Sequence, residues 1–173
     1  MEHTNIIVLL LRFLHIFAGI AWAGAGLLAV TVISPYIAKM QAQGSSPLSN
    51  FYGGSRWSGF MGAAGGITVL AGLILYFGRP LFGWTTMVFS PVGTTVLTIG
   101  AVAGVLALIH GGASLSRKQR QFSEFAASIT GPPTAEQSAQ MTNLAQDLQL
   151  HTTISLVLVL ISVIGMATAR HIY

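Results

Sequence analysis

The sequence predicts an all-α fold, an integral membrane four-helix bundle whose third and fourth helices continue into a cytoplasmic extension. Composition is the first observation, because only 7% of the 173 residues are charged, whereas a soluble domain has roughly 25% charged residues. Hydropathy is the second, because its mean is +0.71. The apolar residues also gather into four stretches, each reaching the ~20 residues that a spanning helix needs.

The four predicted spans belong to one domain that covers residues 1–173. They are residues 6–33, 57–77, 91–113 and 152–169. The first apolar run is far longer than the apolar core of a signal peptide, so we expect it to stay in the mature protein. Small residues four positions apart let helices pack closely in lipid, which predicts a tight bundle. The pairs are Gly19 with Ala23, Gly62 with Gly66, Gly100 with Gly104, and Ala103 with Ala107.

The basic residues predict how the chain is oriented. With four spans, both termini lie on one side of the membrane, and the connections at residues 34–56 and 114–150 lie on the other. Short loops rich in Lys and Arg stay in the cytoplasm, so we expect cytoplasmic connections and termini on the outer side. The cations of the connections are Lys39, Arg56, Arg117, Lys118 and Arg120, and those toward the termini are Arg12, Arg79 and Arg170.

The connection at residues 114–150 predicts a helical hairpin outside the membrane. Apolar residues recur on one helical face before and after a Gly-Pro-Pro break at 131–133. Thr134 and Gln137 form a T-x-x-Q capping box that begins the second helix. The hairpin is either a solvated connection or a docking surface for a partner. Its apolar positions are Leu115, Phe122, Phe125 and Ile129, followed by Met141, Leu144, Leu148 and His151.

Several function classes lack the residues that they need. Without cysteine, the chain has no disulfide, iron–sulfur cluster or C-x-x-C-H haem attachment. No acidic residue lies within a span, which argues against an ion-coupled transporter. The six methionines are scattered and form no copper-type cluster. Because Lys and Arg stand at the ends of the spans, as topology determinants do, we expect no nucleic-acid binding.

Three of the five histidines are candidate ligands because they lie within or beside the spans. An imidazole in lipid requires a hydrogen bond, a proton path or a metal. From the helical rise, His15 lies roughly 7 Å from the bilayer middle toward the termini, and His110 and His151 lie roughly 12 Å from it on the other side. The three histidines therefore form two layers.

His110 and His151 are predicted at the same depth on different helices. Two such imidazoles can ligate a haem iron from opposite sides, and small residues beside His110 favour room for a flat ligand. In the alternative interpretation, both are interfacial histidines held by lipid phosphate or by loop carbonyls.

His15 shares a helical face with Arg12, Gly19 and Trp22. For a haem on this face, His15 would supply an axial ligand and Gly19 would leave clearance beside the ring. Trp22 would form an aromatic wall, and the guanidinium of Arg12 would pair with a propionate. Met166 is level with His15 and can supply the second axial ligand. In the alternative interpretation, His15 only donates a hydrogen bond to a carbonyl or threonine of a neighbouring span. The threonine candidates are Thr94 and Thr98.

The pattern L-H-x-x-x-G-x-x-W-x-G, at Leu14, His15, Gly19, Trp22 and Gly24, resembles the first helix of a group of small bacterial membrane proteins. The group includes CopD-like proteins, the membrane domain of cytochrome-linked urate oxidases and the haem-containing membrane protoporphyrinogen oxidases. The resemblance implies a haem b inside the bundle, ligated by His15, in the bacterial inner membrane. The protoporphyrinogen oxidases also use an intramembrane lysine, and this chain has none within its spans, so we do not expect that activity.

These observations predict a b-type haem protein rather than a stand-alone enzyme. It would hold one or two haems and carry electrons between a quinone or redox partner and a partner enzyme. A redox partner protein or a second copy of the chain is the expected partner within the lipid. Two rival hypotheses remain, a cofactor-free accessory subunit that docks in a larger membrane complex, and a permease for copper or a small solute.

Overall fold

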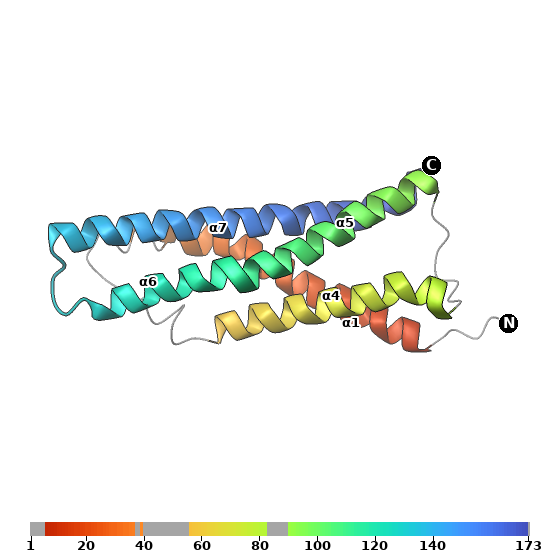
Figure 1. Cartoon of the computed structure of the whole chain (residues 1–173), viewed down its shortest axis with the longest axis horizontal. Helices are drawn as coiled ribbons and strands as arrows, with labels where there is room; N and C mark the ends of the chain where they lie inside the picture. Colours follow the sequence, from red (N-terminus) through yellow and green to blue (C-terminus); the bar gives the residue numbers. More distant parts are fainter. Residues whose placement is uncertain (1–5, 37–38, 40–55, 83–89, 173) are drawn as a thin grey trace.

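Four long helices make up the structure, a computed structural model that describes residues 6–36, 39, 56–82 and 90–172 (Figure 1). No strand occurs among these residues, which confirms the predicted all-α class. Four helices are long and apolar enough to cross a membrane, as predicted. The elements are α1 (Ile6–Leu28), the π-helical turn η1 (Ala29–Ile33), α4 (Trp57–Phe82), α5 (Pro91–His110), the π-helical turn η2 (Gly111–Leu115), α6 (Ser116–Ser128), α7 (Ala135–Thr168) and the 3-10 turn η3 (Ala169–His171).

Local capping explains where α5 and α7 begin. Ser90 precedes α5, and its hydroxyl oxygen accepts a hydrogen bond from the Gly93 amide at 2.9 Å. The predicted capping box starts α7: the Gln137 amide donates to Thr134 Oγ1 at 3.1 Å, and the Thr134 amide donates to Gln137 Oε1 at 2.9 Å. Gly131 has a φ of 88°, which the absence of a Cβ permits in the turn between α6 and α7. The predicted hairpin break is therefore confirmed.

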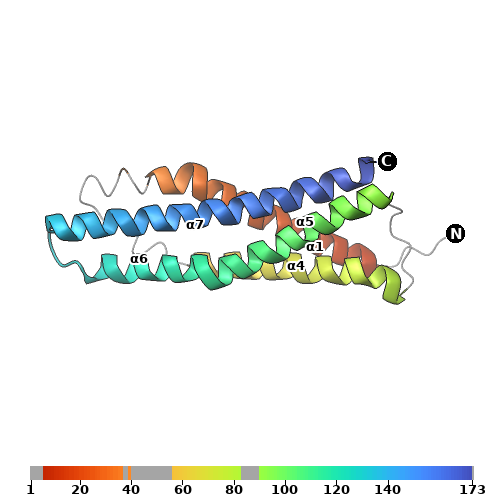
Figure 2. The same ribbon diagram turned by 45° about the horizontal axis from the view of Figure 1, so that its top comes forward.

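The helices form two antiparallel pairs, α1 with α4 and α5 with α7. Packing within each pair is far more extensive than packing between the pairs. Figures 1 and 2 show α5 and α7 side by side, and α1 crossing the bundle from beside α4 near the termini toward α7 at the hairpin end. Large apolar side chains face outward along the bundle, as lipid-facing residues do. The seam between the two pairs is the loosely packed part of the interior.

Glycines lie at the contact between α5 and α7. A Cβ added to Gly165 would lie 3.0 Å from Gly100 Cα and 3.1 Å from the Val96 carbonyl oxygen, and one on Gly104 would lie 2.9 Å from Ser162 Oγ. The two helices therefore touch backbone to backbone, as small residues four positions apart allow. The predicted close packing at Gly100 and Gly104 is confirmed.

The same prediction is wrong for Gly62 and Gly66. A Cβ on either residue would meet nothing within 4 Å. Gly65 and Gly72 of α4 do lie against a neighbouring helix. The rings of Trp22 and His15, on α1, pack against the α4 backbone at Gly65 and Gly72. The two helices therefore approach through side chain against backbone.

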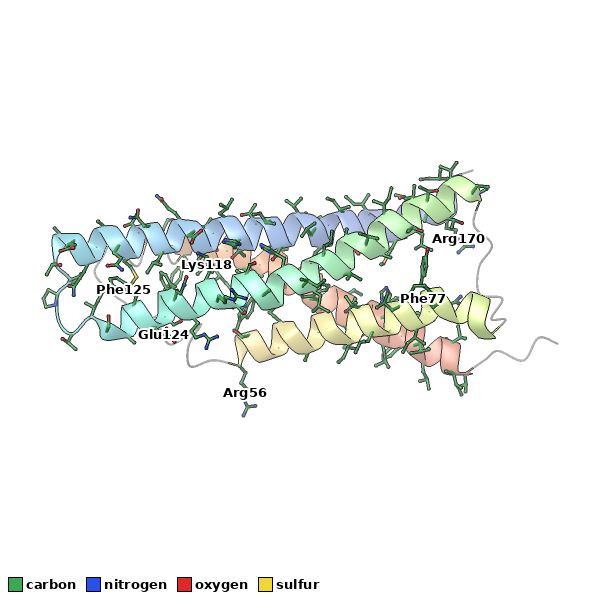
Figure 3. All side chains as sticks on the ribbon, in the orientation of Figure 1. Arg56, Phe77, Lys118, Glu124, Phe125 and Arg170 are labelled. Carbon is green, nitrogen blue, oxygen red and sulfur yellow. The ribbon has the colours of Figure 1, made fainter. Side chains whose placement is uncertain are left out.

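The hairpin of α6 and the first half of α7 extends past the start of α4, at the left of Figure 1. Phe122 is only 1% exposed and Leu148 5%, so the predicted apolar stripes meet in a small core. Around this core pack Ile33, Trp57, Leu115, Met141, Leu144 and Ala145. Figure 3 labels Lys118, Glu124 and Phe125 on the hairpin, and Phe77 and Arg170 toward the opposite end. Ile33, in the turn after α1, and Trp57, at the start of α4, therefore join the hairpin core to the rest of the bundle.

We expect Gly165→Ala to destabilise the protein by about 1–3 kcal/mol, the usual cost of overpacking, because the nearest atoms are backbone and cannot move aside. Gly62→Ala is the matched control, since its Cβ enters open space and its effect should stay within about 0.5 kcal/mol. The measurement is the free energy of unfolding in mixed micelles titrated with SDS, followed by circular dichroism. Equal stabilities of the two variants would contradict the packing described.

Candidate functional site

Among the described residues, two cavities that lie along the seam between the helix pairs contain the candidate residues. The terminal-side cavity has a volume of about 250 Å³ and is lined by all four long helices, including Arg12, His15 and Trp22 of α1, Tyr76 of α4, Leu97 of α5 and Met166 of α7. The hairpin-side cavity has a volume of about 140 Å³, and its lining includes Trp22, Trp57, Met61, Gln119, Thr152 and Ser155. Trp22 lines both cavities and so lies between them.

His15 is held in place by a backbone carbonyl of the neighbouring helix. Its Nδ1 lies 2.7 Å from the Thr68 carbonyl oxygen. A carbonyl oxygen can only accept, so Nδ1 carries the proton and donates it, and Nε2 has a free lone pair. This hydrogen bond matches the alternative interpretation for His15 in kind, although the acceptor is on α4 and is neither Thr94 nor Thr98. It also leaves His15 in the tautomer that ligates a metal through Nε2.

Glycines on α4 receive the rings of α1. A Cβ on Gly72 would lie 2.7 Å from Cε1 of His15, and a Cβ on Gly65 would lie 3.0 Å from Cε2 of Trp22. Both rings therefore rest directly on the α4 backbone. The seven-residue spacing of His15 and Trp22 equals that of Gly65 and Gly72, as the register of two antiparallel helices requires.

The structure brings together most of the residues predicted around His15. Arg12, Trp22 and Met166 line the same cavity as His15. Gly19 has a different position from the one expected, because a Cβ there would meet Thr68 Cγ2 at 3.4 Å. Gly19 therefore faces Thr68 of α4 at an ordinary contact distance, instead of the cavity that His15 lines.

Three features of this cavity are not predicted from the sequence. Gly72 is the glycine that makes room for the imidazole, and the Thr68 carbonyl orients it. The Tyr76 hydroxyl, at the cavity wall, lies 2.8 Å from Thr98 Oγ1 and links α4 to α5. The role of Gly72 could have been inferred from the sequence, because Gly65 and Gly72 have the same seven-residue spacing as His15 and Trp22. The role of the Thr68 carbonyl could not, because every residue has a backbone carbonyl.

His110 and His151 form the second cluster, where α5 meets α7. His110 Nε2 lies 3.0 Å from His151 Nδ1, and His110 Nδ1 lies 2.8 Å from Ser155 Oγ. The ring planes are nearly parallel, with an interplanar angle of 19°, and the centroids are 5.2 Å apart, so the rings meet edge to edge. Because the two imidazoles touch, no space for a flat ligand separates them, so this arrangement does not fit a haem held between His110 and His151.

The cluster continues to the surface of the hairpin. Asp147 Oδ1 lies 3.8 Å from His151 Nε2, and Lys118 Nζ lies 2.6 Å from Asp147 Oδ2. The hydrogen bond from Lys118 holds the pKa of the Asp147 carboxyl below its usual 3.8. Because this pKa is lower in the folded protein, the contact contributes stability above about pH 3.8 and loses it as the pH falls through the lowered value.

Among the described residues, no three His, Cys, Asp or Glu side chains converge as a metal site. No protein-family model matches the chain, and no curated protein and no solved structure is significantly similar to it. The resemblance of the first helix to the CopD-like and protoporphyrinogen oxidase group therefore remains a prediction, and the functional assignment depends on the two clusters themselves.

We expect His15 to carry a proton on Nδ1, the nitrogen that faces the Thr68 carbonyl. The hydrogen bond to the Thr68 carbonyl stabilises that form. Nitrogen-15 NMR of histidine-labelled protein in nanodiscs distinguishes the two ring nitrogens, and the exposed His171 serves as an internal reference. A spectrum in which His15 carries its proton on Nε2 would contradict the geometry.

Proposed function

We propose that this chain binds one haem b in the terminal-side cavity, where Nε2 of His15 would hold the iron, and that it transfers electrons within the membrane. The observation that carries the proposal is the hydrogen bond from His15 Nδ1 to the Thr68 carbonyl at 2.7 Å. Metal-ligating histidines almost always donate their other ring N–H in this way, which fixes the tautomer and orients the ring.

The other lining residues match the chemistry of a haem. A haem iron needs one or two protein ligands, so a single histidine beside a methionine is a sufficient set, whereas a bare metal ion needs more. Met166, from α7, supplies a thioether for the second position. Arg12, one turn before His15, supplies positive charge for a propionate, and Trp22 supplies an aromatic wall.

A bound haem would supply reversible one-electron chemistry, and the chain would set its potential. Apolar lining from all four helices keeps the site at low dielectric, and the imidazole hydrogen bond raises the basicity of the ligand. Electrons would be exchanged with a quinone or a protein partner in the same membrane. A second haem is not included, because His110 and His151 touch each other.

The same proposal places the chain in a bacterial inner membrane, with both termini outside and the α6–α7 hairpin in the cytoplasm. The support is the charge distribution, since Arg117, Lys118 and Arg120 all lie on α6 and Arg56 stands at the start of α4 on the same side. Figure 3 shows Arg56 directed away from the bundle. A basic surface of this kind suits the cytoplasmic face.

The haem proposal is tested with purified full-length protein made under haem supplementation. We expect a reduced-minus-oxidised spectrum of the b type at one haem per chain, and its loss in His15→Ala. In Gly72→Ala, the new Cβ would lie 2.7 Å from the imidazole and displace it. We expect haem affinity to fall about 10- to 100-fold, the usual loss when the groups that orient a ligating histidine are disturbed. Gly66→Ala is the control on the same helix, with nothing within 4 Å, and should retain haem.

Two results would overturn the haem proposal. One is the absence of haem at full supply in a protein that is folded by circular dichroism. The other is full loading in His15→Ala together with loss in His110→Ala or His151→Ala, which would assign the haem to the other cluster.

Orientation is tested by labelling single cysteines, because the chain has none of its own. Ala139→Cys, at an exposed site on the hairpin, should react with a membrane-impermeant maleimide only after intact spheroplasts are permeabilised. His171→Cys, exposed at the other end, should react in intact spheroplasts. The reverse pattern would place the hairpin outside.

A further inference from the structure

The described residues contain a continuous line of polar groups that the haem proposal does not use. It runs from Lys118 and Asp147 on the hairpin, through His151 and His110, to Ser155. Lys118 and Asp147 are 31% and 39% exposed, and His151 is 23% exposed, so the line leads from water toward the interior. Ser155, at its inner end, lines the hairpin-side cavity.

We propose that His151 and His110 form a proton relay between the hairpin surface and the hairpin-side cavity. The relay does not depend on what the terminal-side cavity binds. Its central step is the contact of His110 Nε2 with His151 Nδ1 at 3.0 Å, which is a hydrogen-bond distance between two groups that can each give or take a proton.

The proton balance of one transfer follows from the two ring tautomers. At the start, His151 carries its proton on Nδ1 and His110 carries its proton on Nδ1. His151 Nε2 takes a proton from water beside Asp147, His151 Nδ1 passes its proton to His110 Nε2, and His110 Nδ1 releases its proton toward Ser155. At the end both rings carry their proton on Nε2, one proton has entered and one has left. The same three transfers in reverse, with a proton entering at His110 Nδ1 and one leaving at His151 Nε2, restore the start, so protons exchange between the surface and the cavity.

Asp147 is placed to favour the entry step. Its carboxylate lies 3.8 Å from His151 Nε2, too long for a direct hydrogen bond but suited to a bridging water, and it stabilises a proton on that nitrogen. Lys118 keeps Asp147 ionised through its own hydrogen bond. The titratable groups recorded around the two rings in the described part of the chain are thus Lys118 from α6 and Asp147 from α7.

The hairpin-side cavity can receive the proton. Its volume of about 140 Å³ exceeds the roughly 10–15 Å³ that one water needs, and its mainly apolar lining includes polar residues that can bind waters. These polar residues are Ser58, Ser116, Gln119, Thr152 and Ser155. The π-helical turns η1 and η2 also contribute to the lining, through Ala29 and Gly111, and such turns are frequent at functional sites.

The absence of cysteine allows a direct test of this path. Met61→Cys places a single thiol in the hairpin-side cavity, and Val105→Cys places one in the terminal-side cavity as a control. The S–H stretch, which lies in an empty region of the infrared spectrum, reports exchange of the thiol proton when the protein in nanodiscs is moved into D₂O. His151→Phe removes the ring nitrogens while keeping a ring of similar size.

We expect His151→Phe to slow exchange at the Met61→Cys thiol by at least an order of magnitude and to leave the Val105→Cys thiol unchanged. Asp147→Asn should slow it less, because the entry step loses its carboxylate and the rings remain. An equal exchange rate at Met61→Cys with and without His151→Phe would overturn the relay, as would exchange too fast to follow in every variant, since water would then reach the cavity directly.

A second measurement covers the case in which the cysteine variants do not fold. In histidine-labelled protein, nitrogen-15 NMR should show a scalar coupling between His110 Nε2 and His151 Nδ1 across the hydrogen bond that joins them. In His151→Phe, this coupling to His110 Nε2 should be absent. A protein in which the two nitrogens show no coupling would overturn the proposal.

Discussion

The contact between α1 and α4 is made by rings that rest on glycine, and the positions of the other candidate residues follow from it. His15 lies against Gly72 and Trp22 lies against Gly65, so both rings touch backbone where any side chain on α4 would block them. In lipid, helices gain little from the hydrophobic effect, and close packing and interhelical hydrogen bonds replace it. The hydrogen bond from His15 to the Thr68 carbonyl depends on this approach, because the ring reaches a carbonyl only where α4 presents bare backbone.

The same constraint explains why both cavities lie along one seam. The α1–α4 pair uses its glycines to seat rings, and the α5–α7 pair uses its glycines for backbone contact at Gly100 and Gly165. Each pair packs far more extensively within itself than against the other pair. Small residues such as Gly26, Gly62 and Gly111 line the hairpin-side cavity between the pairs and leave its space unfilled. The space left between them is divided by Trp22, which is large enough to line both cavities. Two separate polar clusters, at His15 and at His110, therefore occur in a single bundle.

Much of this arrangement could be predicted from the sequence. Hydropathy gives four helices, the T-x-x-Q pattern gives the start of α7, and helical periodicity places Arg12, His15 and Trp22 toward one cavity. Depth from the helical rise correctly separates His15 from His110 and His151. The rise does not specify rotation about the helix axis, so it cannot distinguish imidazoles that flank a ligand from imidazoles that touch each other. Nor can it tell which of twenty glycines face a neighbour, and for that reason the spacing rule assigns to Gly62 and Gly66 a contact that Gly65 and Gly72 make.

The distance between the two clusters determines how strongly they can influence each other. From the helical rise their depths differ by roughly 20 Å, and at an effective dielectric constant of about 20 two unit charges at that distance interact by about 0.8 kcal/mol. Such an energy shifts a protonation equilibrium by roughly half a pH unit, since one unit corresponds to about 1.4 kcal/mol. An electron in the terminal-side cavity would therefore not by itself draw a proton onto His110 or His151. Trp22 lines both cavities, so its indole is a side chain in contact with both sites.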